Sequence, residues 1–401
     1  MLFSINLYFK YEDYKKFTSK KIYKTDAIVL NQYIKSKNNK KYFVLKLKAK
    51  DGFLFYTTSK EDLKDLKNRK VLVKILTKNI SFLDYLKSFY APVIDMRLYP
   101  KEESLKNKIF DFIASSHQNQ KTKELFLALF IAKPISKELR ERVQFLGVSH
   151  LIAISGFHLG VLFFVVYNFL KYFYKFFQIR YFPYRNRTLD LTIVSIFFLF
   201  FYISLIDFTP SLIRAFVMLL FGFFLYSRAI KILSFSTLLY SVLMIVALFP
   251  TLIFSIGFWF SVAGVFYIYL FLKYFKDIDK KALFVALNFW VFFAMIPIVH
   301  YFFPIFSLYQ LLSPILSMLF VLFYPVELFL HIIGFGDLLD GVILELFSLK
   351  GDIFLFKSSF YFLVFYILIS ILAIFRKVFF YALFFLILLF FVENIAQLHT
   401  V

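Results

Sequence analysis

Residues 147–175 read GVSHLIAISGFHLGVLFFVVYNFLKYFYK, and this stretch decides the fold class of the chain. From His150 onward, apolar side chains continue for the ~20 residues that a helix needs to cross the hydrocarbon core of a bilayer. Comparable apolar runs recur as far as residue 393. The sequence therefore predicts a polytopic α-helical membrane protein with about 8–10 transmembrane helices, some of them broken or re-entrant.

The composition also indicates a membrane protein. Of 401 residues, 61% are apolar, Phe alone supplies 62, and the mean hydropathy is +0.73, whereas a soluble domain is about half apolar. Residues 1–149 carry 31 Lys+Arg against 15 Asp+Glu, and residues 150–401 carry 16 against 10. A basic N-terminal module thus precedes the membrane domain. Because cysteine is absent, disulfides, thiol nucleophiles and Cys-ligated metals are excluded.

The N-terminal module shows the two-residue alternation of strands. Phe43, Leu45, Leu47 and Ala49 fall on one face of a predicted half-buried strand. We expect strands at 21–34, 43–49, 53–57, 71–76 and 93–98, with a hairpin turn at 37–40 and a short helix at 60–67. Three strands, a helix and two strands is the element order of an OB-fold, a small β-barrel that often binds single-stranded nucleic acid, although other small barrels give similar orders.

The charged segments between spans predict the topology. The expected spans are 150–175, 188–206, 211–228, 232–249, 252–272, 282–303, 305–323, a short or re-entrant piece at 325–335, 353–375 and 378–393. Basic residues mark the first, third, fifth and last connections, while the second, fourth and sixth carry none. By the positive-inside rule the first connection is cytoplasmic, which places the N-terminal module outside. Pro314, Pro325, Glu327 and His331 favour a broken or re-entrant element that lines a polar cavity.

The start of the first span allows two interpretations. Gly156 and Gly160 have the spacing of a close helix contact, and His150 would lie near the membrane interface. Alternatively, Ser155 and Gly156 open the helix locally, and His158 faces a wet path, because ionisable residues inside membranes usually face a cavity.

The same segment carries a family resemblance. Residues 149–160, SHLIAISGFHLG, resemble the signature SHLLAISGLHVG of the ComEC-type competence family, whose members move single-stranded DNA across the cytoplasmic membrane during natural transformation. Thr209–Ala215 resembles the family's P-S-x-x-R-A motif, and Ser255–Ser261 resembles its G-F-x-L-S motif with Phe260 in place of Leu.

A further stretch, Ser307–Pro314, resembles an Asn-containing segment of the family, with Ser313 in place of the Asn. The resemblance covers roughly residues 20–335 and favours the OB-fold interpretation of the N-terminal module.

The resemblance implies a DNA path through the membrane domain. The residues expected to line it are His150, Ser155, Gly156, His158, Asp207, Arg214, Gly257, Ser261 and Gln310. Arg214 is the candidate for holding phosphates, since a polyanion needs fixed positive charges inside the membrane. An Asp207–Arg214 ion pair between helices is the alternative.

Each of the other path residues has a simpler interpretation as well. Gly257, Ser261 and Gly264 suit a packing face, and His300 suits an interfacial position. Gln310, Glu327 and His331 could equally be buried with satisfied partners.

A basic stretch of the N-terminal module is the predicted DNA-binding platform: Lys35, Lys37, Lys40, Lys41, Tyr42, Lys46 and Lys48, interleaved with Tyr33 and Phe43. Charge combined with stacking rings suits sequence-independent binding of single strands. The alternative is a solvated lysine-rich surface.

The family comparison also shapes the expected domains. Members commonly begin with one or two membrane helices, and many end in a metallo-β-lactamase-like domain. We expect residues 1–17 to be the remnant of a membrane helix or a tail, 18–100 an extracytoplasmic OB-fold-like barrel, 101–149 amphipathic interfacial helices, 150–393 the competence-type channel domain and 394–401 a tail. The six histidines form no H-x-H-x-D-H cluster, so we expect neither a metal, a cofactor nor an enzyme activity.

The preferred hypothesis is a passive channel for single-stranded DNA in the cytoplasmic (inner) membrane. No G-x-x-x-x-G-K-[ST] loop occurs, so energy must come from a partner or a gradient. The expected partners are single-stranded DNA, membrane lipids, a periplasmic DNA receptor and a cytoplasmic motor or single-strand-binding protein. The alternatives are a secondary transporter of a small anionic solute or lipid, and an intramembrane enzyme with Ser155 as nucleophile and His158 as base.

Overall fold

The chain divides into two compact units. The computed structural model describes residues 2–37, 40–59, 66, 69–100, 105–152, 154–206, 210–228 and 234–398. The first unit contains Met1–Ser104 with Val242–Ser255, and the second contains Leu105–Ser241 with Ile256–Val401.

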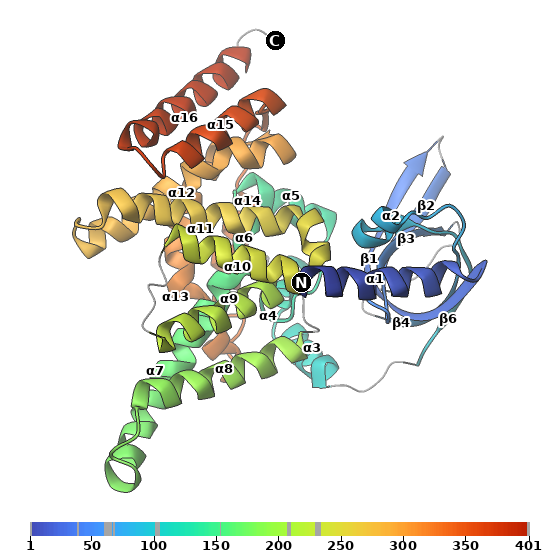
Figure 1. Cartoon of the computed structure of the whole chain (residues 1–401), viewed down its shortest axis with the longest axis horizontal. Helices are drawn as coiled ribbons and strands as arrows, with labels where there is room; N and C mark the ends of the chain where they lie inside the picture. The colour runs from blue at the N-terminus through green and yellow to red at the C-terminus, as the bar shows by residue number, and fades with distance from the viewer. Residues whose placement is uncertain are drawn as a thin grey trace. The chain divides into compact units, whose positions relative to one another are not determined.

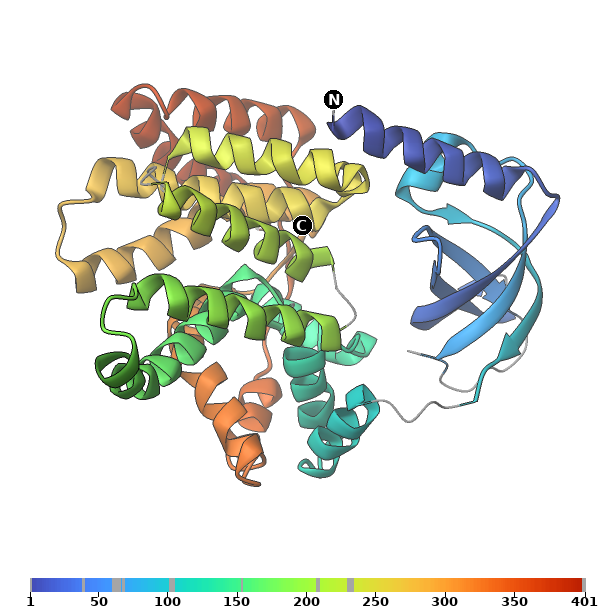
Figure 2. The ribbon, with the colours of Figure 1, turned by 60° about the horizontal axis from the view of Figure 1, so that its bottom comes forward.

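A curved sheet forms the body of the first unit. Its elements are α1 (Leu2–Thr18), β1 (Ile22–Lys37), β2 (Lys40–Ala49), β3 (Leu54–Ser59), β4 (Lys70–Leu76), α2 (Phe82–Lys87), β5 (Phe89–Tyr90) and β6 (Val93–Leu98). The strand order is β5-β3-β2-β1-β4-β6, with every neighbouring pair antiparallel except β3 and β5. Figure 2 shows the strands curving around a common interior.

Strand alternation decides which side of this sheet is buried. Leu45 and Leu47 are 0% exposed and Ala49 is 2% exposed, which confirms the predicted inner face. Phe43 is only half-buried, and Val44, expected on the outer face, is 6% exposed. The β1–β2 hairpin extends as far as the Lys37–Lys40 pair. The helix predicted at 60–67 lies outside the described residues except for Leu66.

The strand pairing leaves the sheet open, so the barrel expected from the sequence is not closed in the described residues. The two edge strands are β5 and β6, and they are consecutive in the chain. Only Ala91 and Pro92 separate them. Pro92 has no N–H group to give to a strand neighbour, which interrupts the pairing at this point.

Helix α1 completes the core of the first unit, and the expectation that residues 1–17 are a membrane-helix remnant or a tail stays a prediction. Phe17 is 1% exposed, and its ring lies 4.9 Å from that of Phe53 and 5.4 Å from that of Phe89, measured between centroids. Tyr14 donates its hydroxyl hydrogen to the carbonyl of Ile80 at 2.9 Å. The end of α1 is therefore packed onto the sheet, beside which it runs in Figures 1 and 2.

The second unit is almost entirely helical. Its elements are α3 (Leu105–Ser115), α4 (Gln120–Ile131), α5 (Lys137–Phe145), α6 (Ser149–Ile152), α7 (Gly156–Tyr181), α8 (Arg187–Leu205), α9 (Pro210–Ser227), α11 (Ile256–Phe275), α12 (Lys280–Phe302), β7 (Ile305–Phe306), the 3₁₀ turn η2 (Leu308–Leu312), α13 (Ser313–Ile332), α14 (Asp340–Ser348), β8 (Phe354–Leu355), α15 (Phe360–Leu372) and α16 (Lys377–Leu398). Helix α10 (Phe235–Leu248) begins in this unit and ends in the first, where the 3₁₀ turn η1 (Pro250–Phe254) follows it.

Six helices of the described residues are long and apolar enough to span a membrane. They are Gly156–Tyr181, Arg187–Leu205, Ile256–Phe275, Lys280–Phe302, Leu308–Ile332 and Lys377–Ala396. Three shorter apolar helices, Leu212–Ser227, Phe235–Leu248 and Phe360–Leu372, accompany them. Neighbours along the chain pack together, among them α7 with α8, α11 with α12, and α15 with α16 (Figure 1).

The segment before the first span is helical, and its expected place at the membrane interface stays a prediction. Helix α4 is buried from Leu125 to Ile131 in the largest apolar cluster of the second unit, together with residues of α5, α7 and α13. This second half of α4 is apolar all round, which is typical of a helical segment enclosed on every side. The interfacial prediction fits α5 better, since Leu139 and Val143 are buried while Lys137 and Glu141 are exposed.

The predicted separate piece at 325–335 is wrong, because α13 runs through Pro325 without ending. The chain turns at Gly334, which has a φ of +88°, and continues into α14. Strand β8 then pairs antiparallel with β7, through Ile305 with Leu355 and Phe306 with Phe354. The two ends of residues 305–355 are therefore paired with each other.

Candidate functional site: a broken helix beside a buried arginine

The first predicted span is two helices. Helix α6 ends at Ile152 and α7 begins at Gly156, so the membrane segment is interrupted within the family-like motif. Ser155 has extended backbone angles, with φ −130° and ψ 179°, and is the N-cap of α7. This arrangement agrees with the interpretation in which Ser155 and Gly156 open the helix.

Ser155 and His158 close the start of α7 as a reciprocal cap. The Ser155 hydroxyl accepts the N–H of Phe157 at 3.3 Å, and the Ser155 N–H donates to Nδ1 of His158 at 3.2 Å. His158 is 0% exposed and lies between the rings of Phe320 and Tyr324, with centroids 5.1 and 4.9 Å away. The Ser155 hydroxyl oxygen also lies 3.2 Å from Nδ1 of His158, so the backbone N–H and the hydroxyl of Ser155 compete for the lone pair that a base toward Ser155 would use.

Two side chains of the segment from η2 to the start of α13, Gln310 and Ser313, fix the chain immediately before this break, and we call this pair the latch. Gln310 of η2 donates from Nε2 to the carbonyls of Gln144 and Ile305, at 2.9 and 3.0 Å. Ser313 donates its hydroxyl hydrogen to the carbonyl of Gly147 at 2.9 Å. Gln310 is thus buried with satisfied partners, as in the alternative interpretation. Ser313, the replacement for the family's Asn, supports the same junction.

Arg214 lies on α9, close to the break. A Cβ atom on Gly156 would lie 3.4 Å from Cβ of Ala215, so the start of α7 touches α9 one residue from Arg214. Arg214 is 9% exposed, and its guanidinium lies 5.8 Å from the ring centroid of Phe258 on α11. Among the described residues its Nε has no hydrogen-bond partner. Asp207 lies outside the described residues, so its ion pair with Arg214 stays a prediction.

The remaining path residues lie nearer the surface of the unit. Gly257 and Ser261 flank Phe258 on α11 and are exposed. His150 is exposed on α6, and its Nε2 lies 3.0 Å from the hydroxyl of Ser317 on α13. Neither Gly160 nor Gly264 has an atom within 4 Å of the Cβ position. A two-point packing contact through Gly156 and Gly160 is therefore absent within the described residues of this unit.

The strand register shows which residues of the predicted DNA-binding platform lie on the same face of the sheet in the first unit. Lys35 pairs with Tyr42, and Lys46 pairs with Tyr56, so these side chains share the outer face. The Lys46 ammonium lies 5.4 Å from the Tyr56 ring centroid.

Lys48 shares that face, and the Lys35 ammonium lies 5.8 Å from the Tyr33 ring centroid. Lys41 points to the opposite face by the same alternation. The side chains of Lys37 and Lys40 lie outside the described residues.

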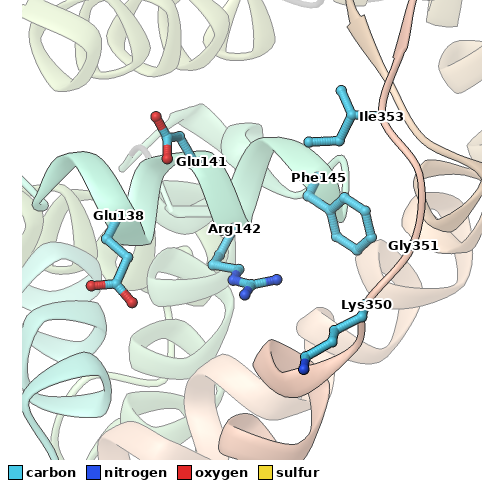
Figure 3. A pocket seen from close by; sticks show the side chains of 7 residues that line it. All are labelled: Glu138, Glu141, Arg142, Phe145, Lys350, Gly351 and Ile353. Atoms are coloured by element: carbon cyan, nitrogen blue, oxygen red, sulfur yellow. The ribbon is translucent and has the colours of Figure 1, made fainter.

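A surface pocket of about 330 Å³ lies beside the latch (Figure 3). Figure 3 shows Arg142 and Phe145 on α5 facing the segment with Lys350 and Gly351, while Glu138 lies farther along the helix. Arg142 donates to the carbonyl of Leu349 at 3.3 Å, which ties α5 to that segment. The sequence did not single out these residues.

The fold and site define a multi-pass membrane protein whose first span is broken next to a buried cation. Over residues 131–394, more than half of its length, the chain matches the family described as Competence protein. The chain belongs to this family, which connects it with DNA uptake for transformation in the cell inner membrane. No curated protein and no solved structure matches the chain.

Proposed function

We propose that the second unit conducts single-stranded DNA across the cytoplasmic membrane. Arg214 carries this proposal. It is a permanent cation in an apolar helix, and no carboxylate among the described residues pairs with it. A charge in this position is costly unless it faces a polar path or a counter-ion, and a phosphate backbone supplies such counter-ions one after another.

The broken α6–α7 segment complements Arg214. Non-helical backbone within a membrane survives where it is enclosed by protein or lines a water-filled cavity. The break touches α9 next to Arg214, so both features meet at the same level of the unit. In this proposal Gly257 and Ser261 of α11 line the same path. The cap formed by Ser155 and His158 holds the backbone at the entrance of the path in place.

The first unit is proposed to be an OB-fold-like module that gathers the strand outside the membrane. Its edge strands β5 and β6 are consecutive in the chain, so one segment of chain meets both sides of the sheet. The outer-face pairs of Lys46 with Tyr56 and Lys35 with Tyr33 combine charge with stacking rings. The basic connections of the membrane domain favour the outside location.

The proposal assigns transport without a covalent step to this chain. The contacts of Ser155 and His158 are those of a helix cap, and Gln310 is engaged by two backbone carbonyls. Energy would come from a cytoplasmic partner or a gradient. A periplasmic receptor that delivers DNA and a cytoplasmic motor or single-strand-binding protein are the expected partners.

Replacement of Arg214 tests the proposal. In the native host, Arg214→Ala is expected to abolish transformants while DNA still accumulates outside the cytoplasmic membrane, and Arg214→Lys is expected to retain part of the yield. Arg228→Ala is the matched control, because Arg228 is exposed and lies 5.8 Å from the Phe224 ring, the same distance as Arg214 from Phe258. A normal transformant yield with Arg214→Ala would contradict the proposal that Arg214 lines the DNA path.

A further inference from the structure

Two histidine rings from distant parts of the chain meet inside the second unit. His117, in the turn between α3 and α4, is 5% exposed, and His331, near the end of α13, is 3% exposed. Their Nε2 atoms lie 3.0 Å apart. The ring of Phe126 stacks on His117 with centroids 4.5 Å apart, and Phe130 meets His331 edge-on at 4.9 Å. The pair therefore lies in aromatic surroundings.

The second nitrogen of each ring has its own partner. Nδ1 of His117 lies 3.0 Å from both carboxylate oxygens of Asp340, the first residue of α14. Nδ1 of His331 lies 2.8 Å from the carbonyl oxygen of Glu327, one turn earlier on α13. Three hydrogen bonds thus run in a row from Asp340 through His117 and His331 to the Glu327 carbonyl.

These three hydrogen bonds need three hydrogens. The Glu327 carbonyl can only accept, so His331 must donate from Nδ1, and its Nε2 accepts if the ring is neutral. His117 must then donate from Nε2, which leaves its Nδ1 as an acceptor facing Asp340. An ionised carboxylate has no hydrogen to donate. Two neutral imidazoles and an ionised carboxylate therefore supply two hydrogens, whereas the three hydrogen bonds need three.

We propose that Asp340, His117 and His331 form a proton-binding site that holds one proton beyond those of two neutral rings. The count is the same whether the proton lies on Asp340 or between the two Nε2 atoms. The hydroxyl of Thr122 lies 2.9 Å from Oδ2 of Asp340 and 3.1 Å from the carbonyl oxygen of Asn119, and when its one hydrogen points to Asp340 it stabilises the ionised carboxylate, with the proton shared by the rings.

Glu327 supplies a second, independent reason for a positive charge here. It is 0% exposed, neither carboxylate oxygen has a hydrogen-bond partner among the described residues, and Oε2 lies 3.4 Å from Nδ1 of His331. A buried carboxylate without hydrogen bonds is costly unless a charge compensates it. The titratable groups facing the rings are Asp340 and Glu327, while the facing side chains of α4, from Thr122, Phe126 and Phe130, do not titrate.

A proton fits the site better than a metal ion. Within the described ranges no group of three or more His, Cys, Asp or Glu side chains could hold a metal, and zinc takes three or four protein ligands. The 3.0 Å separation is that of an N–H···N hydrogen bond. Asp340 is 15% exposed whereas the His117 side chain is 0% exposed, so the proton enters at Asp340. The inference concerns proton binding and does not depend on what the membrane unit conducts.

Asp340→Asn tests the proposal directly. Asn has nearly the same shape, and its amide can donate to Nδ1 of His117, which supplies the third hydrogen without a bound proton. Nitrogen-15 NMR of histidine rings, in the full chain in lipid nanodiscs, reports the protonation of each ring. As the pH rises from about 5, the native chain is expected to lose one proton in a step that both rings share. Asp340→Asn is expected to lack this step.

Controls separate the site from general unfolding and from metal binding. His300→Gln should leave the shared step unchanged, because His300 is also buried but, in the part of the chain that the structure describes, its Nδ1 bonds only to the carbonyl of Ile296. His331→Gln should leave His117 to titrate alone. Three results would each overturn the proposal. The shared step could remain unchanged in Asp340→Asn, or the two rings of the native chain could titrate independently. The third is a step that disappears when a zinc chelator is added.

Discussion

Gly147 and Gln310 are in direct contact: a Cβ atom on Gly147 would lie 3.1 Å from Cβ of Gln310. Gly147 also has a φ of +70°, in the left-handed region that only glycine adopts at little cost. The contact joins the start of the family-like motif to the turn that precedes α13. It therefore fixes where the broken helix begins.

Gly147→Ala is expected to destabilise the second unit. The left-handed conformation alone costs roughly 1–2 kcal/mol for a residue with a Cβ, and the contact with Gln310 adds to it. Gly160→Ala is the matched control, because no atom of the described residues lies within 4 Å of its Cβ position and Ala is the better helix former. Thermal unfolding in detergent checks both variants, and equal midpoints for the two would contradict the latch.

Substitutions of Ser155 distinguish a channel from an enzyme, because a helix cap and a serine nucleophile need different side chains. Ser155→Ala removes the cap of α7 and should cost about 1 kcal/mol, whereas Ser155→Asn keeps an N-cap oxygen and should cost little. Asn cannot act as a serine nucleophile. Transformation by the Asn variant at near-native yield is the expected outcome, and its complete loss in a stably folded protein would favour catalysis.

The outer face of the sheet should determine the binding of single-stranded DNA by the full chain. Tyr56→Ala is expected to weaken binding by about 1–3 kcal/mol if one base stacks on this ring. Lys46→Ala should lower the slope of log affinity against log salt by about 0.7, the effect of one phosphate contact. Fluorescence anisotropy with a labelled oligonucleotide measures both.

Lys41→Ala is the control for these variants, because strand alternation turns Lys41 to the other face. An effect of Lys41→Ala as large as that of Lys46→Ala would count against the platform.

Tyr23 should make the first unit sensitive to strongly basic pH. Burial, followed by the hydrogen bond to Asp51 at 3.1 Å, raises the pKa of Tyr23 from 10.0 to about 12. Because the raised pKa belongs to the folded state, the stabilisation is present below pH 10 and is lost between about pH 10 and 12. Tyr23→Phe should remove this part of the pH dependence in unfolding experiments, and an identical profile in the variant would show that Asp51 and burial have no such effect.

The described helices agree with the sequence where a pattern is long and local. The apolar runs that begin at residues 188 and 282 correspond to α8 and α12, because a span of ~20 apolar residues has few alternatives to a membrane helix. The alternation through Leu45 and Leu47 likewise predicted the buried face of β2. Helix α2 was missed because it is short, whereas α4 lies within the helices expected at residues 101–149.

The candidate site could be predicted only in part. The family-like motifs marked Ser155, His158 and Arg214, and a helix opened at the Ser-Gly pair was one of the two interpretations that the sequence allowed. Gln310 was placed in the path, but the structure engages its amide with two backbone carbonyls. His117 was overlooked, because nothing near it in the sequence suggests that it meets His331 and Asp340.

By itself, the sequence determined that this is a membrane protein of the competence type with a basic strand-rich module, because length, hydropathy and motif are properties of local stretches. Only the tertiary structure decided which polar groups are unpaired and which are satisfied. Arg214 beside Phe258, Gln310 against Gly147, and His117 against His331 each join residues far apart in the chain. The cost of a buried polar group depends on its partners in space, and folding alone brings those partners together.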